Sequence, residues 1–172
     1  PTRDPQVQHS HRLAVLPDAR GLGLGLRLKQ YQREWCLERG IARVRWTFDP
    51  LRAVNATLDI HRLGAQSDTY LVDYYGEMAG INSGIGSDRL LVDWEIGSPV
   101  VAALARGEAR APAGSQIVAV PLPPEADELA SLDATRIRNL RDGVRQALQS
   151  AFGAGLRIVD FDRGRRCYLL AT

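Results

Sequence analysis

The sequence is poor in cysteine. Only Cys36 and Cys167 occur among 172 residues. Small disulfide-stabilised domains need several pairs, and zinc sites need closely spaced ligands, so neither class fits this cysteine content. We therefore expect a reducing, cytoplasmic setting.

Long apolar runs and blocks of like charge are also lacking. No stretch approaches the ~20 apolar residues of a membrane span, and the first residues have no apolar signal-peptide core. The net charge is +2, from 22 basic and 20 acidic side chains. Neither a nucleic-acid tail nor a membrane-binding patch is expected. An initiator methionine is absent too, so we expect the chain to begin within a longer protein.

What is present is the composition of a globular α/β protein, 45% hydrophobic and 24% charged. Alternation between apolar and polar residues predicts strands, and apolar residues three and four apart predict helices. The fold class expected is α/β (α+β), with a mixed, mostly antiparallel sheet flanked by helices. In chain order the pattern predicts strand 9–16, a helix from 24 to Gly40, strand 43–48, helix 53–63, strands 69–75 and 89–95, a connection over 97–114, strand 116–120, helix 133–152, and strands 156–162 and 166–170.

The first predicted helix has a clear amphipathic pattern. Leu24, Leu28, Tyr31 and Trp35 recur at spacings of four, three and four. This spacing places them on one helical face, which is the apolar face of the helix.

A glycine-rich turn joins the first strand to this helix. A helix that begins at such a turn presents free backbone N–H groups and its positive dipole end to an anion. The glycines leave room for a ligand close to the backbone, and Arg20 adds a fixed positive charge. Glycines beside a helix are common, so the turn by itself fits a phosphate site and a plain helix start equally well. Its glycines are Gly21, Gly23 and Gly25.

The residues around the turn resemble the signature of the GNAT superfamily of N-acetyltransferases. Residues 13–25 read LAVLPDARGLGLG, similar to the family's Leu-x-Val-x-Pro strand end followed by Arg/Gln-x-x-Gly-x-Gly/Ala. The resemblance implies acetyl-CoA as co-substrate and no metal. The backbone of Leu13, Ala14 and Val15 would bond the pantetheine arm, between this strand and the next. The pyrophosphate would be held by Arg20, Gly21, Leu22, Gly23, Leu24 and Gly25.

A second, degraded match falls at the expected distance. Residues 55–65 resemble the family segment Asn-x-x-Ala-x-x-x-Tyr-x-x-x-Gly-Phe. By this resemblance Asn55 reaches the cofactor, although a helix cap or turn explains an asparagine there as well. Ile60 stands where the family often keeps the tyrosine that protonates the departing thiolate. That role is vacant or filled from elsewhere.

His11 is the candidate general base. By resemblance it stands four residues before the Val of Leu-x-Val, where several family members have a glutamate. Histidine exchanges its proton near neutral pH, which suits the deprotonation of an amine. The alternative is that His9 and His11 are polar residues of a cleft wall. Two histidines without a third ligand nearby make a poor zinc site.

The tyrosines after the second helix are candidates for the acid. Tyr75 is the one we select, with Tyr70 and Tyr74 as alternatives, although strand packing explains a tyrosine in this region equally well. Asp88 and Arg89 adjoin the glycine-rich loop 76–87. They would line the acceptor pocket or form a charged surface turn.

The expected organisation has three parts. Residues 1–98 form the acetyl-CoA-binding, C-terminal half of a GNAT domain, residues 99–114 a connection, and residues 115–172 a half-GNAT-like block packed on the same sheet. A complete family domain has a strand, one or two helices and two further strands before the element that begins here at His9. We expect that an N-terminal segment is lost. The alternative is that the C-terminal block completes the sheet, in cis or in a swapped dimer.

The expected function is the transfer of an acetyl group from acetyl-CoA to a primary amine of a small molecule or peptide, by direct attack. The alternative is a non-catalytic CoA-binding or regulatory module, which the isoleucine at position 60 favours. A nucleotide-binding P-loop or Rossmann site fits poorly. The turn has no Gly-Lys-Ser/Thr ending, and no acidic residue follows about 20 residues later in a strand. A nucleic-acid or membrane partner is not expected, and a homodimer is left open.

Overall fold

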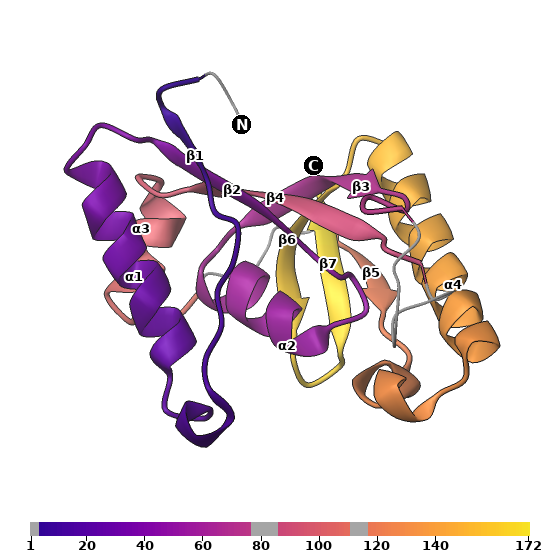
Figure 1. Ribbon diagram of the computed structural model, residues 1–172. Helices are drawn as coiled ribbons and strands as arrows, with labels where there is room; N and C mark the ends of the chain where they lie inside the picture. Colours follow the sequence, from indigo (N-terminus) through magenta and orange to yellow (C-terminus); the bar gives the residue numbers. More distant parts are fainter. Residues whose placement is uncertain (1–3, 77–85, 111–116) are drawn as a thin grey trace.

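The computed structural model describes residues 4–76, 86–110 and 117–172. Its strands form one seven-stranded sheet in the order β1-β2-β4-β3-β6-β7-β5 (Figure 1). Only β1 and β2 pair in parallel, and the other neighbours are antiparallel. The expected mixed, mostly antiparallel α/β fold is confirmed. The strands are β1 Val7–His9, β2 Arg43–Phe48, β3 Gln66–Leu71, β4 Arg89–Glu95, β5 Val118–Pro121, β6 Arg157–Asp162 and β7 Cys167–Ala171.

Helices flank the sheet on both sides of the view in Figure 1, with α1 at the left and α4 at the right. Helices α1 and α2 lie near each other, and the chain that follows β1 runs between them. Local sequence explains their ends. Asp133 caps α4 by accepting the amide of Arg136, and Gly40, with a φ of 68°, follows the end of α1. The helices are α1 Leu24–Leu37, α2 Ala53–Asn55 with its π-helical continuation η2 Ala56–Arg62, α3 Pro99–Ala105, α4 Ala134–Gly153, and the short 3₁₀ turns η1 Pro17–Ala19, η4 Pro124–Asp127 and η5 Leu129–Ser131.

Strands β2 and β4 separate an apolar face from a charged one. On β2 the residues Val44, Trp46 and Phe48 are buried, while Arg43 and Arg45 alternate with them. Arg45 pairs with Asp93 across the sheet at 2.7 Å. The period-two pattern in the sequence therefore becomes a core on one face and a polar surface on the other.

The first predicted strand is shorter than expected. Pairing with β2 ends near Ser10, whose amide still donates to the Arg45 carbonyl at 2.8 Å. The segment then leaves the sheet and reaches η1, where Pro17 starts a tight turn. The alternating residues 11–16 have no continuing ladder, so the prediction of strand 9–16 is wrong beyond its start.

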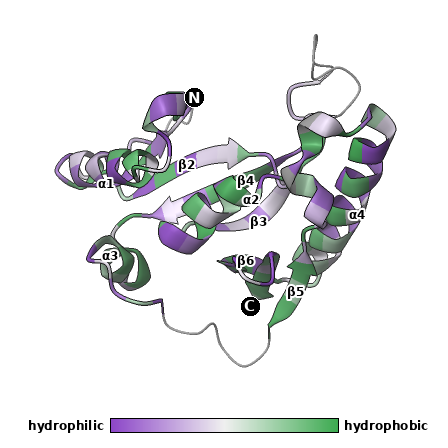
Figure 2. Cartoon of the chain, turned by 90° about the horizontal axis from the view of Figure 1, so that it is seen from below, coloured by the Kyte–Doolittle hydropathy of each residue, from purple (hydrophilic) through white to green (hydrophobic). Residues whose placement is uncertain are grey.

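The apolar face predicted for the first helix is not the face that the structure buries. Leu28, Tyr31 and Trp35 are 49%, 68% and 37% exposed, whereas Lys29 is 3% exposed and Cys36 is fully buried. Figure 2 shows α1 with mixed polar and apolar colours, in contrast to the apolar α3. The inward side of α1 makes specific polar contacts, so hydrophobicity alone misidentifies it.

The expected connection contains a helix. Ser98 caps α3 with its side chain and Pro99 occupies the first turn, which is a helix start that the alanine, glycine and proline content concealed. Helix α3 packs closely on Gly64, because a Cβ there would lie 2.9 Å from the side chain of Leu104. Residues 111–114 lie outside the described residues, as do 77–85 of the glycine-rich loop.

Residues 117–172 share the sheet and the core with the preceding part of the chain. Ser67 of β3 is in register with Ile158 of β6, and the hydroxyl of Tyr168 donates to the Pro50 carbonyl at 2.8 Å. None of the described helices has the length and apolar character needed to cross a membrane.

Candidate functional site

The glycine turn has the backbone that its sequence predicts. Gly21 and Gly23 have φ values of 80° and 71°, and no atom lies within 4 Å of a Cβ built on either. Glycine is therefore required here by conformation rather than by crowding. Gly23 is the N-cap of α1, so the free amides of a 14-residue helix point out of this turn.

A cleft opens where β1 and β2 separate. The parallel register pairs Val7, Gln8 and His9 with residues 43–45, and beyond Ser10 the two segments diverge. The cleft has a volume of about 620 Å³. Its walls are residues 10–15 on one side, Trp46, Thr47 and Phe48 of β2 on the other, and residues of α1, α2 and η2 at its ends. The separation of two parallel segments thus creates a slot that begins at the glycine turn.

The structure brings most of the predicted site residues to this cleft. Gly21, Leu22, Gly23 and Leu24 lie in the turn that precedes and begins α1. Arg20 connects turn and cleft, because its Nε donates to the Val15 carbonyl at 3.4 Å. The predicted residues that line the cleft are His11, Leu13, Ala14, Val15, Arg20, Gly25 and Asn55.

Tyr75 lies apart from this group. It is 53% exposed, its amide donates to Ser87 Oγ at 2.9 Å, and the Arg89 guanidinium is 5.0 Å from its ring. Among the described residues that line the cleft, Tyr75 does not appear. Ile60 is fully buried and carries no exchangeable side-chain proton.

Tyr70 and Asp88 belong to a different, buried contact. The Tyr70 hydroxyl donates to Asp88 Oδ2 at 2.7 Å, and Arg145 of α4 binds the same carboxylate through two bonds of 2.8 and 3.0 Å. Burial together with the bond to Asp88 raises the pKa of Tyr70 far above its ordinary value. Asp88 is fully buried, so these residues join α4 to the sheet and leave no exposed charge pair.

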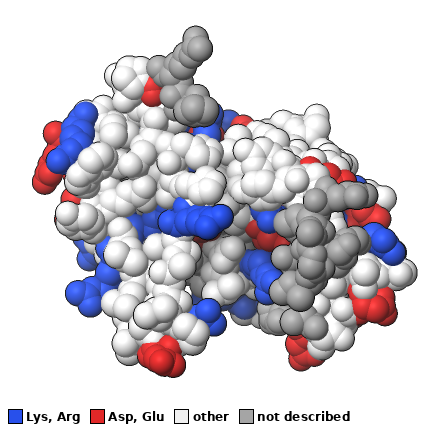
Figure 3. Space-filling view, viewed as in Figure 1, with Lys and Arg blue, Asp and Glu red and all other residues white. Residues whose placement is uncertain are grey.

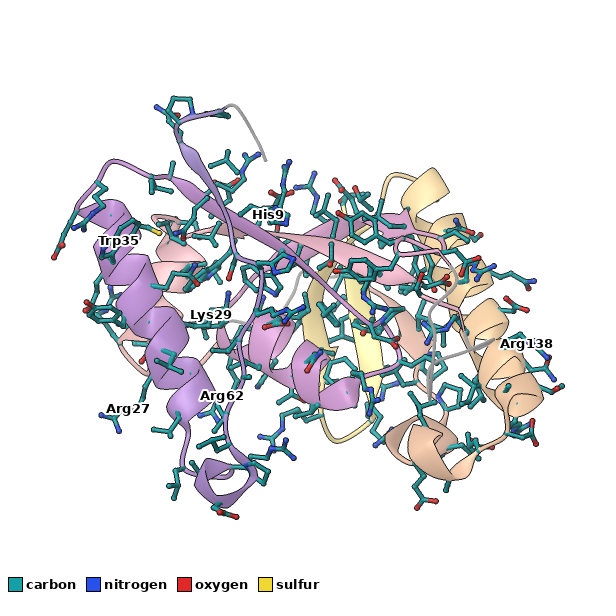
Figure 4. The ribbon with its side chains drawn as sticks, in the orientation of Figure 1. His9, Arg27, Lys29, Trp35, Arg62 and Arg138 are labelled. Atoms are coloured by element: carbon teal, nitrogen blue, oxygen red, sulfur yellow. The ribbon has the colours of Figure 1, made fainter. Side chains whose placement is uncertain are left out.

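Lys29 is the cleft residue that sequence reasoning missed. It lies on the side of α1 that faces the sheet, whereas Arg27 points away (Figure 4). Its Nζ donates to Ser10 Oγ at 3.1 Å and to Gln32 Oε1 at 3.2 Å. The same atom lies 3.6 Å from the centre of the Trp46 ring, a cation–π contact.

Asp59 of η2 completes the polar end of the cleft. It is 6% exposed, and the Trp46 side chain hydrogen-bonds to its carboxylate. Burial raises the pKa of Asp59 to about 6, against the opposing effects of Trp46 and Lys29. Burial lowers the pKa of Lys29 to about 8, with Asp59 and Cys36 opposing it. Two ionisable groups at the end of the cleft thus titrate closer to neutral pH than usual.

A feature of the composition could have identified this residue. Lys29 is the single lysine among 22 basic residues, and all the others are arginine. Arginine keeps its proton at any ordinary pH, whereas a buried lysine can release one. Of the 22 lysine and arginine side chains, Lys29 is therefore the one able to release a proton near neutral pH, and it is buried in the cleft.

The surroundings of the cleft favour an anionic ligand. Arg12, Arg20 and Lys29 line it, with Asp59 as its one carboxylate. On the face of the molecule seen in Figure 1, basic side chains surround a hollow near the middle (Figure 3). Within the described ranges, no group of three or more His, Cys, Asp or Glu side chains is placed to hold a metal ion.

Comparison with known proteins agrees with this geometry. The acetyltransferase (GNAT) family model matches residues 2–64, which run from β1 through the glycine turn, α1 and β2 to the end of η2. No curated protein and no solved structure matches the chain significantly. The segment that forms both walls of the cleft is the segment that is similar to the GNAT acetyltransferase family.

Proposed function

We propose that the chain binds acetyl-CoA in the cleft between β1 and β2 and transfers its acetyl group to a primary amine. The observation that carries this proposal is the separation of the two parallel segments at Ser10, directly upstream of the glycine turn. An anion-binding helix start and a slot for an extended arm are thereby joined in one path.

Each part of the ligand has a counterpart along that path. The pyrophosphate would accept bonds from the amides that begin α1 and from Arg20. The pantetheine arm would run back along the backbone of residues 15 to 13. The thioester then lies near Ser10 and His11, at the end of the cleft that Lys29 closes.

His11 is suited to the deprotonation of the acceptor amine. It lines the cleft, while the neighbouring His9 lies in β1 opposite Arg45. Burial, followed by the charges of the N-terminus, His11 and Arg45, lowers the pKa of His9. His11 therefore has the access to ligand that His9 lacks.

The proposal is tested with CoA binding by calorimetry and thiol release from acetyl-CoA over a panel of amines. Arg20→Ala should weaken CoA binding by ~10- to 100-fold, because a charge-assisted bond contributes roughly 1.5–3 kcal/mol. Arg27→Ala is the matched control, since Arg27 is an exposed arginine of α1 that does not line the cleft, and this variant should bind CoA as the wild type does.

The outcomes separate the alternatives. CoA binding with turnover on at least one amine supports the acetyltransferase. Binding that depends on Arg20 without turnover on any amine favours a non-catalytic CoA-binding module. Equal binding by the two variants would exclude the cleft as the CoA site.

A further inference from the structure

Lys29 lies at the point where the segment after β1 separates from β2. Its Nζ is bonded to Ser10 Oγ at 3.1 Å, and Ser10 is the last residue whose amide bonds to β2. A ligand arm that enters at the glycine turn and follows residues 15 to 13 ends at this point. The one ε-amine of the protein thus lies where the proposed ligand places its sulfur.

The chemistry of the transfer requires a proton at that position. When the acetyl group leaves, the C–S electron pair remains on sulfur, and a thiolate is a better leaving group if it is protonated as it departs. Ile60 supplies no proton, and the guanidinium groups of Arg12 and Arg20 hold theirs too tightly. Asp59, with a pKa of about 6, is mostly ionised at neutral pH and holds no proton to give there. Lys29 is the remaining charged donor at this end of the cleft.

We propose that Lys29 is the acid of the reaction and gives its ammonium proton to the sulfur of the departing CoA. This inference rests on the proposed function. The acceptor nitrogen forms a bond to the thioester carbonyl carbon, the carbon–sulfur bond breaks, and the pair on sulfur takes the proton from Nζ. Lys29 regains a proton from solvent, while His11 passes the proton lost by the acceptor to solvent.

The surroundings of Lys29 suit this role. Trp46 from β2 and Asp59 from η2 stabilise the charged form, as does Cys36 from α1, while burial disfavours it. Arg12, Arg20 and His11 are the other basic groups that line the same cleft. Burial dominates and lowers the pKa of Lys29 to about 8. This value is close to the ordinary ~8.5 of a thiol, so proton transfer between the two groups is nearly balanced.

The test compares wild type with Lys29→Met and Lys29→Arg, in both CoA affinity and the pH dependence of kcat. The methionine variant removes the proton and keeps the length of the side chain. The arginine variant keeps the charge but holds its proton throughout the assay range. Urea unfolding of each variant shows that the fold is retained.

Both variants should lose ~10²-fold or more in kcat and keep a CoA affinity within about threefold of wild type. The wild-type kcat should fall as the pH rises through about 8. The kcat of the variants should not show this decrease. Full rate in Lys29→Arg would show that charge alone suffices, and full rate in Lys29→Met would remove Lys29 from the chemistry. Either result overturns the inference while the acetyltransferase stands, whereas a wild type inactive on every amine overturns both.

A second measurement is independent of turnover. Because Lys29 is the single lysine, an amine-reactive ester labels only this side chain and the N-terminal α-amine, which serves as the internal reference. Bound CoA should slow labelling of Lys29 by at least tenfold. Equal labelling with and without CoA would place the sulfur elsewhere and contradict the inference.

Discussion

At the scale of single residues, the cleft contains two buried groups whose pKa values are shifted in opposite directions. Burial raises the pKa of Asp59 to about 6 and lowers the pKa of Lys29 to about 8. At neutral pH the protein therefore keeps two charges in a poorly solvated place. Such groups cost stability when ionised, and residues retained at that cost are often functional.

The Asp59 contribution should be visible in the pH dependence of unfolding. Between its ordinary pKa of 3.8 and its folded pKa of about 6, the native state holds a proton that the unfolded chain has lost. Raising the pH through this window therefore lowers the free energy of unfolding. Asp59→Asn lacks this loss, so its stability relative to wild type should increase from pH 4 to pH 7, by roughly 3 kcal/mol at most.

Urea unfolding of both proteins at pH 4 and at pH 7 measures this difference. Lys29→Met provides the converse control. Above pH 8 the native state has lost the Lys29 proton that the unfolded chain keeps up to 10.5, so wild-type stability is regained there as the pH rises. An Asp59→Asn difference that stays constant with pH would contradict the assignment of the shift to Asp59.

At the scale of elements, α4 is attached to the first part of the chain by two arginine–carboxylate pairs. Arg141 binds Asp49 through two bonds of 3.0 Å, and Arg145, one helical turn later, binds the fully buried Asp88. Burial alone would raise the pKa of Asp88, but Arg145 and the bonds from Asp73 and Tyr70 outweigh it and the pKa is lowered. The helix is thus positioned by charge as well as by its apolar face.

Arg145→Met should destabilise the protein by about 3 kcal/mol or more, because it leaves a buried carboxylate without its cation. Arg136→Met is the matched control on the same helix. Arg136 pairs with Glu125 near the surface, where such pairs contribute about 0–1 kcal/mol. Urea titration gives both values, and equal losses would show that the Arg145 pair is no stronger than a surface pair.

The elements also show how far the sequence predicts the fold. Strands 43–48 and 89–95 were predicted to the residue, because one face of each is buried and their side chains alternate without interruption. The helix predicted over 133–152 differs from α4 by only one residue at each end, because its start at Asp133 is visible in the sequence. The strand expected over 9–16 is wrong beyond its start because its continuation leaves the sheet, which no local pattern records.

The site was predicted less completely than the fold. The glycine turn could be recognised from its glycines at the start of a predicted helix, whereas residues 13–15 were named only through the resemblance to the family signature. Lys29 could not be found from helical periodicity, since it lies away from the apolar face that the periodicity selects, on the side of α1 that the structure buries. Its role depends on Trp46 and Asp59, which are 17 and 30 positions away in the sequence and meet it only in the folded chain.

At the scale of the whole molecule, the first and last parts of the chain share one sheet. Strand β6 pairs with β3, η2 packs against β6, and the Tyr168 hydroxyl bonds the Pro50 carbonyl. The two arginine pairs of α4 add to these contacts. We therefore expect both parts to unfold together in one cooperative transition.

The two cysteines report on this directly. Cys36 lies in α1 and Cys167 in β7, both buried, and burial raises the pKa of each thiol, which slows their reaction in the native state. Pulse labelling across a urea gradient should expose both over the same range. Labelling of Cys167 at clearly lower urea than Cys36 would show that the C-terminal part opens by itself.

The divergence of β1 and β2 has a consequence for the lifetime of the folded protein. An extended ligand arm in that slot would take the place of an interior strand and join the two segments as a ladder does elsewhere in the sheet. Half-life against heat and proteases would then follow the supply of CoA, since a ligand that binds only the folded state stabilises it in proportion to the logarithm of its concentration. If CoA binds as proposed, the folded protein should persist longest when CoA is abundant.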